Sequence, residues 1–435
     1  MKPGNNSISV LYLSYDGMTD PLGQSQVIPY LQGLAEEGYQ FTIISFEKKE
    51  RYKEGKEQIQ QMLDGSGIHW VPLTYHKRPP VLSTLYDVYT LQKRAYELHR
   101  KYNFRIVHCR SYIPALIGMS MKRAFKTKFI FDMRGFWADE RVECGLWNLK
   151  NPVYKIIYQY FKRKEEQLLN TADYTITLTH KAKDIIHHWE GVGNQPIPIQ
   201  VIPCCVDTAL FDPGKIAESD QEALRKALNI PADAFILSYL GSLGTWYMVE
   251  EMLCFYKQLL ESQPNALFLF ITKDSPDEIC QICKKHHINM DKIVVTPASR
   301  REVPLYLSLS NWSIFFIKPV FSKQASSATK MGEIMSMGIP MIVNSNIGDT
   351  DQIIEAANCG YLIKEFTLIK YQEAGKQVLA WTDSSSASIR TGAKKFFHLE
   401  AAVARYYEVY TSVVHPMVLI AFLPISLPSL LLYGS

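Results

Sequence analysis

The chain has 435 residues, 47% of them hydrophobic and 21% charged, which argues against a wholly disordered protein and against one that crosses a membrane many times. Its length favours two or three domains, and its net charge of +4 is too small to indicate nucleic acid as a partner. Residues 1–200 carry 27 basic and 20 acidic side chains, whereas residues 201–435 carry 20 and 23. The basic first half suits either an anionic partner, such as a phospholipid surface or a phosphorylated substrate, or an ordinary solvated face.

Short apolar runs alternate with segments of helical period, which predicts an α/β fold of two facing, doubly wound, Rossmann-like domains with a cleft between them. The clearest helices are Gln24–Glu37, Leu82–Tyr102 and Pro152–Leu169. The strands expected in the first half are Ile8–Ser14, Phe41–Phe46, Ile68–Pro72, Arg105–Cys109, Lys128–Asp132, Tyr174–Leu178 and Gln200–Pro203. Those expected in the second half are Phe235–Leu240, Leu267–Thr272, Ile293–Thr296, Trp312–Ile317, Met341–Asn344 and Tyr361–Ile363.

The same pattern sets the expected domain boundaries. An N-terminal domain over residues 1–206 is followed by a linker over 207–233 and a C-terminal domain over 234–398. A helix over residues 399–412 is expected to return to the N-terminal domain, and residues 413–435 form a hydrophobic tail without Asp, Glu, Lys or Arg. The tail is long enough to span a bilayer, but its prolines would kink such a helix. A membrane-inserting segment, a segment packed on the body and an aberrant extension all remain open.

The N-terminus has no apolar run after its first charge, so no secretory leader is predicted and a cytoplasmic protein is expected. The eight cysteines lack the spacing of a disulfide framework and are interpreted as reduced core residues. Cys280 and Cys283 precede His286 and His287, which invites a zinc interpretation. Because a second ligand pair at loop spacing is missing, no metal site is predicted.

In α/β sheets ligands bind beyond the carboxyl ends of the strands, so the loops there are the candidates for chemistry. After the first strand, a loop containing Gly17 and Gly23 leads into a helix at Gln24, where amide groups can receive an anion or a sugar hydroxyl, or form only an ordinary turn. Arg110 ends the fourth strand.

The run Asp132–Glu143 is predicted to be a long loop after the fifth strand. It combines Arg134, Asp139 and Glu140 with two aromatic residues, a mixture that can stack on a sugar ring and bond its hydroxyls. Alternatively, its carboxylates are salt-bridged and structural.

In the second half, a glycine turn follows the first strand. It holds Gly241, Ser242, Gly244 and Thr245. Because glycine lacks a Cβ atom, the backbone at its two glycines can approach a phosphate closely, although a plain turn is also consistent. The chain contains neither G-x-G-x-x-G nor a Walker A motif, which argues against a dinucleotide dehydrogenase and a P-loop NTPase.

The most informative run is Lys318–Pro340, where a polar loop leads into a helix expected to begin near Ser327. Hydroxyls at Ser326, Ser327 and Thr329 surround the helix start, and Lys330 adds a full positive charge, so this end suits a diphosphate. Glu333, one turn later, can accept both hydroxyls of a ribose. The alternative is a capped helix with an internal Lys330–Glu333 pair.

Together these runs resemble the GT-B glycosyltransferases of family 4, over roughly residues 8–412. The resemblance rests on Pro21–Gln26 (PLGQSQ), on Gly241–Gly244 (GSLG) and on Thr329–Glu333 (TKMGE). It also rests on Val201–Asp207 (VIPCCVD), which is similar to the family's VIPNGVD, and on Glu333–Pro340, which is similar to its EAMACGxPV.

The resemblance implies a retaining enzyme that moves a sugar from a nucleotide-sugar donor to a glycan or lipid-linked glycan, without a metal or other cofactor. It implies that the first domain binds the acceptor and the second binds the donor, with Lys330 and Arg300 acting on the leaving phosphate and Asp139 or Glu140 orienting the acceptor. The implied acceptor residues are Gly23, Gln24, Arg110 and Arg134. The implied donor residues are Gly241, Ser242, Gly244, Thr245, Ser326, Ser327, Thr329 and Glu333.

Two positions depart from the family pattern. Ala325 stands where the family usually has the first of two glutamates, and the glycine turn lacks the Arg and Lys that many members place after it. A nucleotide-sugar 2-epimerase of the same architecture and a donor-binding protein that has lost catalysis therefore stay open as alternatives.

A contact with the inner face of the membrane is a further expectation. Tyr154–Lys164 interleaves aromatic and basic residues, which suits a helix lying on anionic lipid, although its aromatic residues can instead pack on the sheet.

Overall fold

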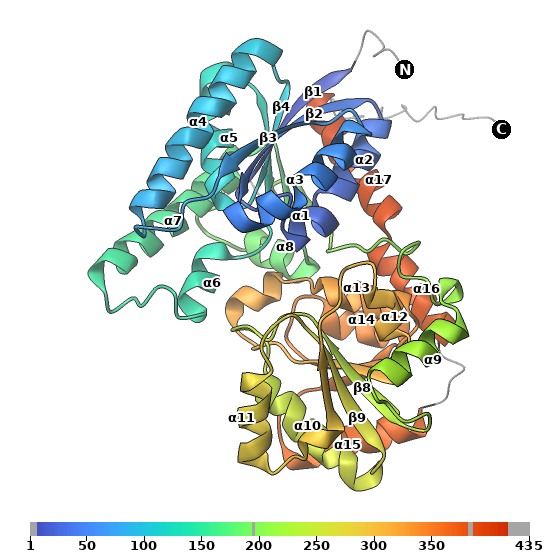
Figure 1. The fold of residues 1–435 in the computed structure, drawn as a ribbon. Helices are drawn as coiled ribbons and strands as arrows, with labels where there is room; N and C mark the ends of the chain where they lie inside the picture. The colour runs from blue at the N-terminus through green and yellow to red at the C-terminus, as the bar shows by residue number, and fades with distance from the viewer. Residues whose placement is uncertain (1–6, 194–195, 382–385, 416–435) are drawn as a thin grey trace, which may run out of the picture.

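The computed structural model describes residues 7–193, 196–381 and 386–415, and these form two α/β halves, each built on a parallel sheet (Figure 1). The first sheet has seven strands in the order β3-β2-β1-β4-β5-β6-β7, and the second has six in the order β10-β9-β8-β11-β12-β13. The prediction of two Rossmann-like parallel sheets is confirmed. The proposed domain boundaries remain a prediction.

The strands of the first sheet are β1 (Ile8–Ser14), β2 (Tyr39–Glu47), β3 (His69–Thr74), β4 (Ile106–Arg110), β5 (Lys128–Asp132), β6 (Tyr174–Thr177) and β7 (Ile199–Val201). The helices of this half are α1 (Pro21–Gln26), α2 (Ile28–Glu36), α3 (Lys49–Asp64), α4 (Leu82–Tyr102), α5 (Tyr112–Phe125), α6 (Trp137–Glu143), α7 (Pro152–Thr171) and α8 (His180–His187).

The second sheet consists of β8 (Phe235–Leu240), β9 (Ala266–Ile271), β10 (Ile293–Thr296), β11 (Trp312–Phe315), β12 (Met341–Asn344) and β13 (Gly360–Ile363). The later helices are α9 (Glu218–Ala227), α10 (Val249–Ser262), α11 (Asp277–His286), α12 (Val303–Leu307), α13 (Thr329–Ser336), α14 (Thr350–Ala357), α15 (Leu368–Ala380), α16 (Ser386–Phe397) and α17 (Leu399–Val414). Short 3-10 turns are η1 (Pro213–Lys215), η2 (Met290–Lys292) and η3 (Phe321–Ala325).

Each sheet is covered on both faces, which explains why its strands are nearly continuous apolar runs. In the first half, one apolar core lies under α4, α5, α7 and α8, and the other lies under α2, α3 and α17. The strand order reverses between β1 and β4 in the first sheet and between β8 and β11 in the second, and loops diverge at these points to leave room for ligands.

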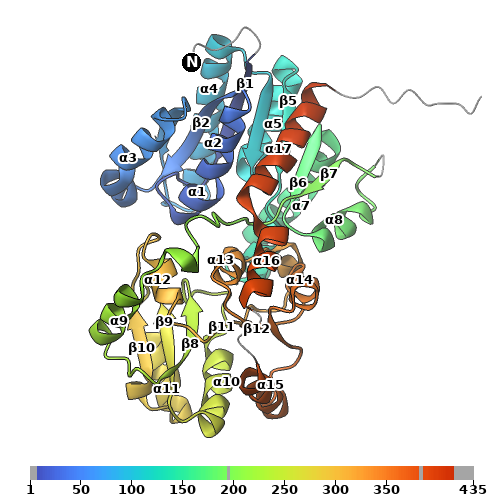
Figure 2. The ribbon, with the colours of Figure 1, turned by 90° about the vertical axis from the view of Figure 1, so that its right-hand side faces the viewer.

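The last helix crosses from the second half back to the first (Figure 2). Tyr406 and Tyr410 of α17 pack in the same core as Tyr12 of β1, and the Tyr410 hydroxyl lies 2.7 Å from Nδ1 of His108. The predicted return of this segment is therefore what the structure has. Most of the predicted tail, residues 416–435, lies outside the described residues.

Two local predictions were wrong. The helix expected over Gln24–Glu37 is split at Val27, because Pro29 has no N–H for the carbonyl of Ser25 and its ring crowds that carbonyl. The expected loop Asp132–Glu143 contains α6. Asp139 and Glu140 in its first turn interact favourably with the helix dipole, and Ala138 is buried. The segment proposed as a linker contains α9, and its boundaries remain a prediction.

None of the helices in the described ranges is both long and apolar enough to cross a membrane.

Candidate functional site

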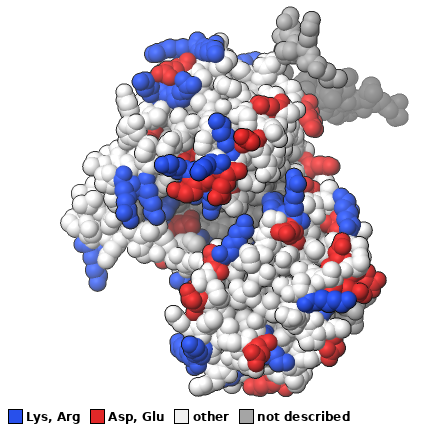
Figure 3. Space-filling model, viewed as in Figure 1, with Lys and Arg blue, Asp and Glu red and all other residues white. Residues whose placement is uncertain are grey.

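The two halves meet at the carboxyl edges of their sheets, where the surface is hollowed between them (Figure 3). Lys323 of η3 donates to Glu140 of α6 at 3.0 Å, and the amide of Ser322 donates to Glu143 at 3.0 Å. Phe321 stacks on Phe136 with ring centroids 4.9 Å apart. These contacts fix the loop before α13 against the first half.

The glycine turn after β8 is shaped by its hydrogen bonds. The amide of Leu243 donates to Asp274 at 2.6 Å, and Gly241 has φ +113°, a conformation that favours glycine. A Cβ on Gly241 would lie 3.0 Å from Nζ of Lys330, whereas a Cβ on Gly244 would meet nothing within 4 Å. The first glycine therefore brings the backbone against the Lys330 ammonium.

Lys330 lies on the first turn of α13 and is buried, with 7% of its surface exposed. Its Nζ lies 3.6 Å from the ring centroid of Tyr247 and 4.3 Å from that of Tyr239, and it donates to the Tyr239 hydroxyl at 3.2 Å. Among the described residues, no carboxylate forms an ion pair with it. Burial holds the pKa of Lys330 well below its usual value, although the nearby charge of Glu333 opposes this effect. An anion arriving here would meet a lysine without a carboxylate partner among the described residues, and it would favour the protonated form of that lysine.

Glu333 is paired with Arg300 instead. Nη1 of Arg300 lies 2.8 Å from Oε1 of Glu333, and the guanidinium also packs over the ring of Phe211. The alternative of an internal Lys330–Glu333 pair is therefore not what the structure contains. The Arg300 bond fixes the glutamate and leaves Lys330 without a partner of opposite charge.

The hydroxyl groups near the helix start have different surroundings. Oγ of Ser327 accepts from the amide of Cys204 at 3.2 Å, so this side chain joins the two halves. Helix α13 begins at Thr329, two residues later than expected. Ser326 precedes it in extended backbone. In the glycine turn, the carbonyl of Ser242 accepts from the Tyr239 hydroxyl, and Thr245 is exposed.

In the first half, the loop after β1 is fixed by a buried carboxylate. Glu47 accepts from the amides of Met18 at 2.7 Å and Thr19 at 3.1 Å. Gly23 packs directly on this loop, since a Cβ there would lie 2.2 Å from the carbonyl oxygen of Gly17. Gln24 donates from Nε2 to the carbonyl of Thr19 at 3.1 Å. Glycine is therefore needed at position 23 so that the helix start can pack against the loop.

A buried charged cluster lies at the ends of β4 and β5. Asp132 is fully buried, and neither of its carboxylate oxygens has a hydrogen-bond partner in the described part of the chain. Arg110 and Arg134 approach it at 3.7 and 3.8 Å, and Nε2 of His108 lies 3.9 Å away. Burial raises the pKa of Asp132, but the charges of Arg134, Arg110 and His108 outweigh it, so the net pKa is lowered. The carboxylate stays ionised between two guanidinium groups.

The two acids proposed to orient an acceptor are both occupied. Asp139 accepts from the Tyr158 hydroxyl at 2.8 Å and from Nζ of Lys162 at 2.9 Å, both on α7. Glu140 is the partner of Lys323 described above. These pairs match the structural interpretation of the two carboxylates, and their role toward an acceptor remains a prediction.

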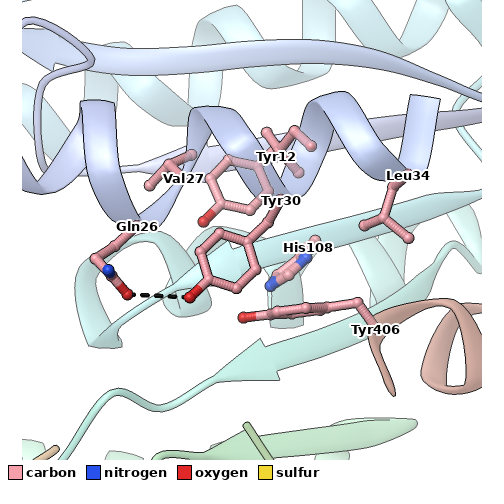
Figure 4. A pocket seen from close by; sticks show the side chains of 8 residues that line it. Tyr12, Gln26, Val27, Tyr30, Leu34, His108 and Tyr406 are labelled. Carbon is pink, nitrogen blue, oxygen red and sulfur yellow. Dashed lines mark hydrogen bonds between the residues drawn. The ribbon is translucent and has the colours of Figure 1, made fainter. Parts of the chain in front are cut away.

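A small cavity lies beside the cluster but cannot be the substrate site. Tyr12, Tyr30, His108 and Tyr406 line it, with the Tyr30 hydroxyl bonded to Gln26 at 3.2 Å (Figure 4). Its volume of about 10 Å³ has room for about one water molecule.

Cys204, at the crossing between the halves, connects the buried charged cluster of the first half with the start of α13 in the second. Its Sγ accepts from Arg134 at 3.3 Å, and its amide donates to Ser327. The predicted acceptor residue Arg134 and the predicted donor residue Ser327 are thus brought together around one cysteine.

The sequence reasoning missed the aromatic pair Tyr239 and Tyr247 as part of the site, and did not select His108 or Asp132. Tyrosines flanking a strand-end glycine turn, and ionisable residues ending neighbouring strands, are the signals that point to them. At Ala325 the structure has an apolar contact, since this residue is buried in the core of the first half.

At the candidate zinc residues, Cys280, Cys283 and His286 lie on α11, and His286 contacts Glu250 at 2.6 Å. In the described ranges, no group of three His, Cys, Asp or Glu side chains could hold a metal ion.

The fold and sequence were compared with known proteins. The chain is similar to sucrose-phosphate synthase from Thermosynechococcus elongatus, with 15% identity, TM-score 0.70 and coverage of 94% of this chain and 100% of that chain. It is also similar to a glycosyltransferase from Rickettsia africae, with 16% identity, TM-score 0.68 and coverage of 94% and 99%. Anabaena Alr3699/HepE in complex with UDP and glucose has 13% identity, TM-score 0.66 and coverage of 93% and 100%. No curated protein matches the sequence.

Two family models match successive parts of the chain. "Glycosyltransferase Family 4" matches residues 25–210, and "Glycosyl transferases group 1" matches residues 220–395. Together these ranges cover most of the chain, and their order agrees with the two parallel-sheet halves joined by α17. The chain therefore belongs to the family 4-type glycosyltransferases of the GT-B fold.

Proposed function

We propose that the protein transfers a sugar from a nucleotide-sugar donor to a glycan or lipid-linked glycan on the cytoplasmic side of the membrane, with retention of the anomeric configuration. The observation that carries this proposal is Lys330, a buried lysine next to the glycine turn at Gly241 that has no carboxylate partner among the described residues. A diphosphate would supply the negative charge that this pocket lacks.

The donor is proposed to bind in the second half. Its diphosphate would accept hydrogen bonds from the Gly241–Thr245 turn and from the amides around Ser326, Ser327 and Thr329, next to Lys330. Glu333, fixed by Arg300, would accept the ribose hydroxyls. Because Anabaena HepE was solved with UDP and glucose, a uridine diphosphate sugar is the first donor to test.

In the proposed reaction, the bond between the anomeric carbon and the phosphate oxygen breaks while an acceptor oxygen bonds to the same carbon. Positive charge from Lys330 and Arg300 would stabilise the departing oxygen, so neither a metal nor another cofactor is required. Retention would follow from departure and attack on the same face, with the acceptor proton passing to the departing phosphate oxygen. No enzymic nucleophile is assigned.

The acceptor is proposed to bind against the first half, near Arg110 and Arg134 and the loop around Gly23 and Gln24. Asp139 or Glu140 would orient its hydroxyl after releasing a present partner.

A panel of uridine, guanosine, adenosine and cytidine diphosphate sugars, incubated with and without candidate acceptors, tests the proposal. Transfer with retained configuration supports it. An isomerised nucleotide sugar formed without acceptor would identify an epimerase, and binding without any turnover would identify a protein that has lost catalysis. Absence of binding to every member of the panel would overturn the proposal.

A further inference from the structure

The first half carries an unusual apolar surface on two helices. In α4, Leu82, Leu85, Tyr86 and Tyr89 are all exposed, from 56% to 64%. Their spacing of three and four residues places them on one face of the helix, opposite Asp87 and the other buried positions. Further along the same face Lys93 is exposed, so the normal polar surface resumes after two turns.

Helix α7 repeats the feature. Val153, Ile156 and Tyr160 are exposed at 55%, 66% and 46%, and they share one face. In the loop before α7, Leu146 and Leu149 are also exposed. Exposed large apolar residues that gather in this way mark an interaction surface more often than scattered ones do.

Both stripes lie at one corner of the molecule. α4 and α7 each contact α5, and both begin at the carboxyl edge of the first sheet. Figure 1 shows their first turns converging on the corner next to α6, and Figure 3 shows this corner as a mainly uncharged projection with Lys and Arg at its margin. We define the apolar corner as the exposed residues Leu82, Leu85, Tyr86, Tyr89, Leu146, Leu149, Val153, Ile156 and Tyr160.

Basic residues outnumber acidic ones in the two segments that carry the apolar corner, although Lys162 is paired with Asp139 and Glu165, and Arg94 with Glu97. Residues 144–164 contain five Lys or Arg and no Asp or Glu. Residues 77–94 contain four Lys or Arg and a single acid, Asp87, which is buried and bonded to Tyr15 and His76. Such a surface complements a negatively charged bilayer, whereas a second copy would bring like charges together.

We propose that the apolar corner docks on the surface of a bilayer containing anionic phospholipid. The apolar stripes would enter the headgroup region, the tyrosines would lie at the interface, and Lys155, Arg163 and Lys93 would contact lipid phosphates. Asp87, on the buried face of α4, accepts from the Tyr15 hydroxyl at 2.8 Å, so helix α4 itself packs against the loop after β1 on the proposed acceptor side. This surface goes beyond the transfer reaction and does not depend on it.

Sedimentation of the full chain with vesicles tests the proposal, using phosphatidylcholine vesicles with and without phosphatidylglycerol. Leu85→Gln combined with Ile156→Gln should weaken binding to the anionic vesicles at least about tenfold, and Lys155→Gln with Arg163→Gln should weaken it and reduce its salt dependence. The matched control is Leu368→Gln with Ile369→Gln, because these side chains are 56% and 66% exposed on α15 of the other half, and it should bind like wild type.

Unchanged binding by the Leu85/Ile156 variant would overturn the proposal, and it would assign any membrane binding to another segment, such as residues 416–435. Equal binding of wild type to neutral vesicles would also overturn it. Loss of a dimer, detected by gel filtration, without loss of vesicle binding would identify a second copy as the partner. Melting curves verify folding, and UDP calorimetry on the same variants reports the donor site separately.

Discussion

Replacing Lys330 with Met removes one charge while keeping a long apolar side chain between Tyr239 and Tyr247. In the empty protein, Nζ of Lys330 lies against two aromatic rings and bonds to one hydroxyl, and Gly241 lies directly beside it. The substitution therefore leaves no broken ion pair behind. What it removes is the interaction with a bound diphosphate.

The expected loss can be worked from Coulomb's law. Two unit charges about 4 Å apart at an effective dielectric constant of about 20 interact by about 4 kcal/mol. If that interaction is made with the departing phosphate in the transition state, and about 1.4 kcal/mol corresponds to a factor of ten, kcat/KM should fall roughly a thousandfold. Donor affinity should fall less, because charge on the departing oxygen increases as the bond breaks.

Proton uptake gives a second measurement. Since burial lowers the pKa of Lys330 well below its usual value, a bound diphosphate should raise it again, and donor binding should take up a proton. Calorimetry in buffers of different ionisation enthalpy measures this uptake. It should disappear in Lys330→Met and persist in the control Lys376→Met, which changes an exposed lysine on α15.

Stability should change in the opposite direction from activity. The lowered native pKa means that the unfolded chain binds more protons than the native one between that pKa and the usual value, so this contribution to stability increases with pH. Lys330→Met should therefore melt at a higher temperature than wild type at pH 7, with the difference shrinking toward pH 10. A variant with wild-type turnover, or with unchanged proton uptake, would refute the reasoning.

Three further predictions concern other parts of the site. Gly241→Ala should lower stability by about 1–2 kcal/mol and weaken donor binding, because its φ is +113°, whereas Gly244→Ala has open space and should melt like wild type. Burial raises the pKa of Glu165 to about 6, although Lys162 opposes this shift. The native protein therefore binds more protons than the unfolded chain between pH 4.5 and 6, and its stability should fall as the pH rises through that range. Melting temperatures of Glu165→Gln should lack this pH-dependent fall. Lys323 pairs with Glu140 across the two halves. In melting experiments, a double-mutant cycle of Lys323→Met and Glu140→Gln should give a coupling free energy of about 1 kcal/mol. A coupling of zero would show that the pair does not hold the halves together.

Much of the site could be read from local patterns. Strand-end positions follow from apolar runs, because buried parallel strands have few polar residues, although the loop predicted over Asp132–Glu143 proved to contain α6. Lys330, with Glu333 one turn later, was placed on the start of a helix because both residues belong to one short run. The segment Tyr154–Lys164 left two interpretations open from the sequence: Phe161 is buried and Tyr160 is exposed, and contact with a membrane remains a prediction.

Pairings between distant segments could not be read in this way. The sequence suggests Glu333 as the partner of Lys330, since they are three residues apart, but Arg300 comes from a different loop and takes the glutamate. The partners of Asp139 and Glu140 likewise come from α7 and from the other half. Ion pairs depend on which side chains the fold brings within about 4 Å, and sequence separation does not measure that distance.

The amino-acid sequence by itself determined two parallel-sheet domains and the run that carries the cation at the start of α13, because hydrophobic periodicity and helix-start chemistry are local properties. Only the tertiary structure decided that Lys330 is enclosed by Tyr239 and Tyr247 without a counter-charge, and that Cys204 joins Arg134 to Ser327. The tertiary structure also decided that the apolar corner is exposed, because an amphipathic sequence pattern does not show which face of a helix its neighbour covers.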